Sequence, residues 1–193
     1  MADPRVRQAP RQRILDTAYE LFSRNGIRAV GVDRIVAESS VAKMTLYRHF
    51  PSKAELALAF LDLREQRWTR EWLQREVHRA ASTPRDRLLA VFDVLDTWFR
   101  RPDYEGCSFI NTLLETGPSD PLHEAAAQHL AVITDFIEDL ARQTGAEDPK
   151  NMAVQLQILM MGAIISAGRG DLEAARRGRA AGELILDQGA PPG

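Results

Sequence analysis

Residues 31–56, GVDRIVAESSVAKMTLYRHFPSKAEL, constrain the fold more than any other part of the chain. Their spacing predicts two short helices joined by a tight turn. In the first, Val32, Ile35 and Val36 share one helical face. In the second, Leu46 and Phe50 lie four residues apart and therefore point into the same small core.

The second of these helices has a distinctive outward face. The side chains that point away from the core are Met44, Thr45 and Arg48, with Lys43 and Tyr47 on the flanks. This face mixes donors, a hydroxyl and an apolar tip, which is what contacts to base edges and phosphates require. The pattern is typical of a helix-turn-helix that places its second helix in the DNA major groove. The residues alone leave one alternative open, a surface helical hairpin with scattered charge.

The residues that follow mark the start of a further helix. Pro51 ends the preceding helix after Phe50, and Ser52 is a good N-cap for the next one. Lys53 falls in its first turn, where free backbone N–H groups favour an anion. The ammonium group and the helix end are therefore expected to share one phosphate.

Residues 11–56 resemble the DNA-binding domain of the TetR/AcrR family of transcriptional repressors. The matching positions are Arg13-Ile14-Leu15, Ala18, Leu21-Phe22, Gly26, Val32, Ile35 and the stretch from Val41 to Leu56. The resemblance implies that Lys43, Met44 and Thr45 face base edges. It also implies contacts to the phosphate backbone from Tyr47, His49 and Lys53. The predicted DNA-binding set consists of these six residues together with Gly31 and Arg48.

The chain departs from the family pattern at several positions. Ser39-Ser40 stands where Ala-Gly is usual in the turn, and serine reaches the left-handed region only at some cost. Ala42 removes a side-chain cap, whereas Gly31 still offers its N–H. Asp33 lies where some members read bases with a basic residue, so we expect a different operator.

The charge distribution agrees with a DNA-binding N-terminus. Residues 1–56 contain ten Lys and Arg against six Asp and Glu, a net charge of +4, whereas residues 57–193 carry −6. The single cysteine, Cys107, excludes a disulfide within the chain. We see neither an apolar run of transmembrane length nor a signal segment, and therefore expect a cytoplasmic protein without membrane association.

The whole chain is predicted to be all-α, with about nine helices. A three-helix helix-turn-helix domain is expected at residues 1–56, a helical ligand-binding and dimerisation domain at 57–187, and a disordered tail at 188–193. The long fourth helix, from about residue 53 to 80, should link the two domains. Pro, Gly, Ser and Asp at the intervening breaks set the limits of the other helices.

The segment NMAVQLQILMMGAIISAG, residues 151–168, is apolar on most of its circumference. A helix of this kind needs burial on several sides. We expect a homodimer that forms a four-helix bundle, with interface residues Leu156, Leu159, Met160 and Ala163. The alternative is the central core helix of a monomer.

The family resemblance further implies a ligand cavity in the helical domain. The candidate lining residues are Leu63, Trp98, Phe109, Leu113 and His129. The expected function is a regulator, in the first instance a repressor, that binds a pseudo-palindromic double-stranded DNA operator and is released by an unknown small, mainly apolar effector. The alternative is a helix-turn-helix protein controlled by a protein partner without such a ligand.

An enzyme is disfavoured because the sequence has no nucleophile elbow, phosphate-binding glycine loop or zinc spacing. His123 and His129 are six residues apart and do not share a helical face. We therefore predict no metal site and no cofactor.

Overall fold

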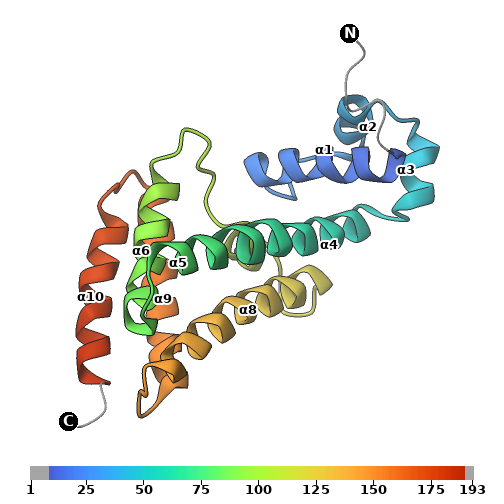
Figure 1. Ribbon diagram of the computed structural model, residues 1–193. Helices are drawn as coiled ribbons and strands as arrows, with labels where there is room; N and C mark the ends of the chain where they lie inside the picture. Colours follow the sequence, from blue (N-terminus) through green and yellow to red (C-terminus); the bar gives the residue numbers. More distant parts are fainter. Residues whose placement is uncertain (1–8, 190–193) are drawn as a thin grey trace. The chain divides into compact units, whose positions relative to one another are not determined.

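The computed structural model describes residues 9–189, and every regular element in this range is a helix (Figure 1). The elements are α1 (Pro10–Asn25), α2 (Val32–Ser39), α3 (Lys43–His49), α4 (Lys53–Arg64), η2 (Glu65–Gln74), α5 (Arg75–Ala80), α6 (Pro84–Phe99), α7 (Ser108–Glu115), α8 (Pro121–Gln143), α9 (Pro149–Gly168) and α10 (Ala174–Gln188). If the continuous run from α4 to α5 counts as one, the described residues form nine helices. The predicted all-α fold is confirmed.

Local capping explains where several helices begin. The side chains of Ser52, Thr83 and Asp148 each accept a hydrogen bond from the backbone N–H three residues later, at 3.1, 3.1 and 3.0 Å. Each cap satisfies one of the N–H groups that a helix start leaves free. The start of α4 after Ser52 is the one predicted from the sequence.

The run from Lys53 to Ala80 is not a uniform α-helix. Its middle part, η2, is π-helical over ten residues, which the sequence pattern does not predict. Trp68, Thr69 and Leu73 of this stretch are buried. Trp68 Nε1 and Thr69 Oγ1 have no hydrogen-bond partner in the described part of the chain. Wide helical turns of this kind occur frequently at functional sites.

The chain forms two compact units. Unit 1 comprises residues 9–65 and 108–129, and unit 2 comprises residues 66–107 and 130–189. In unit 1, α2, α3 and α4 pack on α1, and α7 packs on α4. The ring of Phe60 meets Tyr19 and Phe22 edge-on at 5.7 and 5.4 Å between centroids. The predicted boundary after residue 56 falls inside α4, which belongs wholly to unit 1.

In unit 2, α10 packs closely on both α6 and α9. Two glycines of α10 permit this approach. A Cβ atom at Gly178 would lie 2.9 Å from the Phe92 ring, and one at Gly182 would lie 3.2 Å from it. Helix α10 ends at Gln188, the first residue of the predicted tail, and residues 190–193 lie outside the described range.

Helix α9 is two-sided. Leu156, Met160 and Ala163 are only 2, 2 and 5 % exposed and belong to the core of the protomer. This burial corrects the predicted interface, because side chains that pack inside one subunit are not free to meet a second. Leu159 is half-buried.

The opposite face of α9 carries Val154, Ile158 and Ile165, which are 40, 62 and 50 % exposed. By length and composition α9 could cross a membrane, contrary to the expectation from the sequence. This finding is weak evidence for a membrane span, because a core helix of a water-soluble protein has the same properties.

Candidate nucleic-acid interface

The outward face of α3 is built on a buried anchor. Leu46 is fully buried and Phe50, the C-cap residue, is 3 % exposed, so both hold α3 against the rest of unit 1. Met44 is 80 % exposed and Tyr47 is 38 % exposed. Single exposed apolar side chains are common on protein surfaces, so Met44 gains significance only from the polar and basic groups around it.

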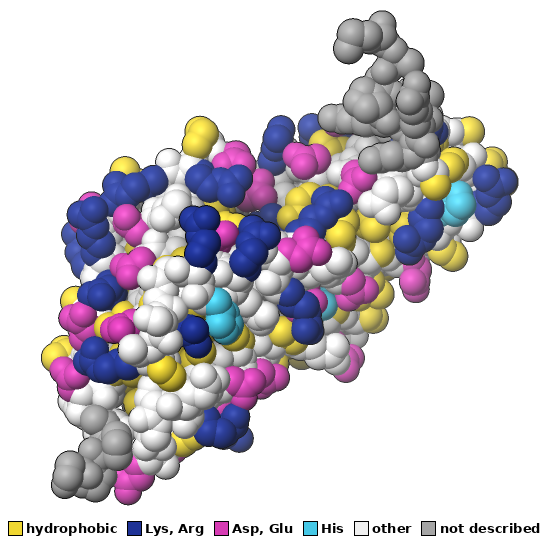
Figure 2. All heavy atoms as spheres, viewed as in Figure 1, with side chains coloured by type: hydrophobic (Ala, Val, Ile, Leu, Met, Phe, Trp, Pro, Cys, Tyr) yellow, Lys and Arg dark blue, Asp and Glu magenta, His cyan; other side chains and the backbone are white. Residues whose placement is uncertain are grey.

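The remaining residues of the predicted set surround these two. Lys43 and Arg48 are exposed, and Thr45 and His49 are half-buried at the edges of the face. Figure 2 shows the corner of unit 1 that carries α3, where basic, histidine and hydrophobic side chains lie next to one another at the surface. The predicted residues of α3 therefore all reach the surface around the buried Leu46, and their contacts to DNA stay a prediction.

The turn before α3 has the features expected from the departures in sequence. Ser40 adopts the left-handed conformation with φ 53° and ψ 45°. Ala42 provides no side-chain cap for α3. Gly31 is the exposed N-cap of α2, in an extended conformation and also without a side-chain cap.

Lys43 has a partner that the sequence pattern did not reveal. Its Nζ atom donates to Asp33 Oδ1 at 2.6 Å, which links the start of α3 to the first turn of α2. This hydrogen bond, followed by the charge attraction, raises the pKa of Lys43 above its usual value. Ten residues separate the two side chains in sequence, so only the packing of α2 against α3 brings them together.

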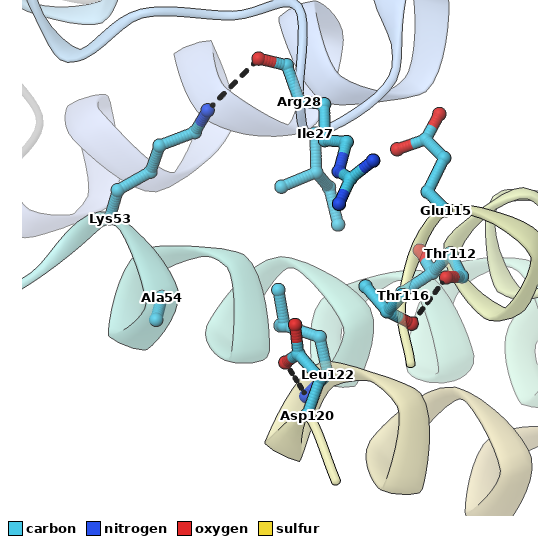
Figure 3. A pocket seen from close by; sticks show the side chains of 9 residues that line it. All are labelled: Ile27, Arg28, Lys53, Ala54, Thr112, Glu115, Thr116, Asp120 and Leu122. Carbon is cyan, nitrogen blue, oxygen red and sulfur yellow. Dashed lines mark hydrogen bonds between the residues drawn. The ribbon is translucent and has the colours of Figure 1, made fainter. Parts of the chain in front are cut away.

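Lys53 lies at the edge of a cavity in unit 1. Its Nζ atom donates to the backbone oxygen of Arg28 at 3.3 Å, and partial burial lowers its pKa. The cavity has a volume of about 220 Å³ (Figure 3). The residues that line it come from the α1–α2 loop, the start of α4, and the α7–α8 region; they are Ile27, Arg28, Lys53, Ala54, Thr112, Glu115, Thr116, Asp120 and Leu122.

The predicted ligand residues do not line this cavity. Leu63, Phe109, Leu113 and His129 belong to unit 1, whereas Trp98 belongs to unit 2. Phe109 packs on the His129 ring at 5.2 Å, and His129 Nε2 lies 3.3 Å from Asp62 Oδ1.

Trp98 belongs to an aromatic cluster in unit 2. Its ring lies 4.9 Å from Trp68 and 6.1 Å from Trp72 between centroids. A second cavity of about 350 Å³ lies beside Trp72 in the same unit. In the described part of the chain, no three His, Cys, Asp or Glu side chains are grouped so that they could hold a metal ion.

Known proteins with a similar sequence and fold show which family this helix-turn-helix belongs to. The model of the family "Bacterial regulatory proteins, tetR family" matches residues 14–60, which contain α2, α3 and most of α1 and α4. The chain is 31 % identical to SCO4454, a TetR-family transcriptional regulator from Streptomyces coelicolor. The two structures superpose with a TM-score of 0.84 over 94 % of this chain and 96 % of that one. The chain belongs to the TetR family of transcriptional regulators.

Two further proteins similar to this TetR-family regulator are also described as regulators of transcription. A putative TetR-family transcriptional regulator from Streptomyces avermitilis is 30 % identical, with a TM-score of 0.84 over 94 % of this chain and 98 % of that one. The regulator YjdC of Escherichia coli, described as HTH-type, is 24 % identical and covers 86 % of this chain and 90 % of its own length. The protein is therefore a DNA-binding helix-turn-helix regulator of transcription.

Proposed function

We propose that this TetR-family regulator is a homodimeric repressor in the cytoplasm, that it binds a pseudo-palindromic DNA operator, and that a small, mainly apolar molecule releases it. The observation that carries the proposal is the outward face of α3. Met44 is 80 % exposed there beside a lysine and an arginine, while Leu46 beneath is fully buried. A rigid helix that presents apolar and basic groups together suits the major groove.

The DNA contacts divide into two groups in this proposal. Lys43, Met44 and Thr45, in the first turn of α3, face base edges. The groups that hold the phosphate backbone lie around them; they are Tyr47, Arg48, His49, Lys53 and the backbone N–H of Gly31. Contacts of the first group select a sequence, and those of the second fix register and supply affinity.

The exposed face of α9 supports the homodimer. Val154, Ile158 and Ile165 fall on one stripe of the helix, and Leu184 of α10 is 64 % exposed. Two copies of this face, related by a two-fold axis, would form the four-helix bundle. Dimerisation also places two α3 helices on one DNA, at a spacing of about one helical turn or more.

Unit 2 offers groups for an effector. The buried Trp68 Nε1 and Thr69 Oγ1, both without a partner among the described residues, would gain a hydrogen bond from a bound molecule. The polypeptide of α4 continues directly into η2. A ligand that alters the η2 turns therefore acts on the helix that begins at Lys53. Release then requires that the ligand binds the DNA-free state more tightly.

Selection of bound duplexes from a random DNA pool tests the DNA-binding part of the proposal. We expect the wild-type protein to enrich a palindromic motif. Tyr47→Ala should weaken binding to every duplex by a similar factor, because it removes a phosphate contact that carries no sequence information. Lys53→Ala should do the same and also reduce the salt dependence, because it removes a cation. If a well-folded wild-type protein enriches no motif, operator reading by α3 is wrong.

The effector part has its own test. A compound that binds unit 2 should lower operator affinity, and operator DNA should lower affinity for the compound by the same factor. If saturating compound and operator bind independently, the release mechanism fails even if the DNA motif stands.

A protein partner remains the second candidate for control. Leu114 of α7 is 79 % exposed and would be the point of contact in this scheme. Under this alternative no small molecule changes operator affinity, and Leu114→Ser abolishes the response to the partner. Neither scheme requires the protein to catalyse a reaction.

A further inference from the structure

The ion pair between Lys43 and Asp33 lies on the proposed DNA-facing side of the protein. Lys43 is the first residue of α3 and Asp33 is the second residue of α2. The 2.6 Å contact joins side chains that are 55 % and 83 % exposed. Because both groups stand in solvent, the pair adds little to the stability of the fold.

The carboxylate restricts what the lysine can do. A free lysine is a flexible point charge that follows phosphates as readily as bases. One of the three donor directions of the Lys43 ammonium is held by Asp33 Oδ1, which fixes the end of the side chain. Two donors remain for acceptors such as O6 and N7 of guanine.

The carboxylate of Asp33 also reduces the positive charge that this surface presents to DNA. Together, Asp33 and Lys43 have no net charge, so the pair contributes little to phosphate attraction. Without Asp33, the full ammonium charge of Lys43 would attract phosphates along any duplex.

We propose that Asp33 is a specificity-determining residue: it positions Lys43 for base readout and cancels the charge of Lys43 toward phosphates. The pair then discriminates among sequences where an unpaired lysine would raise affinity for all of them. This inference rests on the proposed DNA-binding function of α3.

The chain provides a matched control on the same helix. Glu38 pairs with Arg34 at 2.8 Å, one turn apart within α2, and these side chains are 47 % and 50 % exposed. Asp33→Ala and Glu38→Ala change the net charge equally, but only the first releases Lys43. Asp33→Asn removes the charge and keeps an acceptor oxygen, which separates positioning from charge cancellation.

The experiment combines duplex selection with titrations of the selected and a shuffled duplex at several salt concentrations. For Asp33→Ala we expect affinity for shuffled DNA to rise by about threefold or more, with a salt slope steeper by about 0.9. Preference at one base position of each half-site should fall by about tenfold. Asp33→Asn should raise shuffled-DNA affinity but keep part of that preference. Glu38→Ala should leave base preference unchanged.

A double-mutant cycle shows whether Asp33 acts through Lys43. In a Lys43→Met background, Asp33→Ala should change base preference by less than about twofold. An unchanged motif in Asp33→Ala, an equal loss in Glu38→Ala, or independent effects of the two single variants would overturn the inference. If the wild-type protein selects no motif, the proposed function itself fails, and the inference falls with it.

Discussion

At the scale of single residues, Ser40 has an unfavourable backbone conformation in the turn between α2 and α3. Its φ of 53° makes it the only non-glycine residue between 9 and 189 with positive φ. For a residue with a Cβ this conformation costs about 1–2 kcal/mol. Ser40 is the C-cap residue of α2, and its left-handed conformation ends that helix shortly before α3 begins at Lys43.

This conformation predicts a stabilising substitution. Ser40→Gly should raise the free energy of unfolding by about 0.5–1 kcal/mol, because glycine removes the strain but gains entropy in the unfolded chain. Urea denaturation followed by circular dichroism measures it. Ser39→Gly is the control, since Ser39 is helical and 4 % exposed and should be destabilised by glycine. Destabilisation by Ser40→Gly would show that the serine side chain supports the turn.

At the scale of elements, the contact of α10 with α6 depends on small residues at one seam. The Phe92 ring is 1 % exposed and fills the space next to Gly178 and Gly182. Close approach of two helices at glycines leaves no room for a methyl group. The glycines therefore contribute through packing, although glycine is a poor helix former.

Gly178→Ala should accordingly destabilise the protein by about 1–3 kcal/mol, because the added Cβ would lie 2.9 Å from Phe92 Cε1. Gly162→Ala on α9, whose Cβ meets nothing within 4 Å, should instead leave stability unchanged or raise it by up to about 1 kcal/mol. Thermal denaturation of both variants measures these two changes in stability. Equal effects would mean that helix propensity, not the Phe92 contact, decides stability here.

At the scale of the whole molecule, α9 has one apolar face that packs in the protomer and another that is exposed to solvent. Ala163 faces the core at 5 % exposure, whereas Ile158 faces solvent at 62 %. A helix with an inner and an outer apolar face can stabilise its own subunit with one and a second copy with the other. The two faces should respond differently to a charge.

We expect Ile158→Glu to yield folded monomers that bind operator DNA weakly, because a charge in a dimer interface must be desolvated. Ala163→Glu should unfold the protomer. Light scattering and circular dichroism distinguish the two results. Leu114→Glu is the control, because Leu114 is 79 % exposed on α7 and lies outside the α9 face. An Ile158→Glu protein that remains a dimer would place the interface elsewhere.

The sequence by itself determined the features that depend on neighbours along the chain. Apolar spacing set the helices, Ser52 and Thr83 began two of them, and the residues around Leu46 identified a helix-turn-helix. These signals are local, because a cap or a helical face is formed within a few residues.

Only the tertiary structure decided which of several compatible faces is buried. Helix α9 is apolar nearly all round, so its sequence could not tell that Leu156 faces inward and Ile158 outward. The π-helical turns of η2 and the contact between Asp33 and Lys43 were likewise hidden. Each depends on how one helix packs against another, and residue spacing within a single helix does not encode that contact.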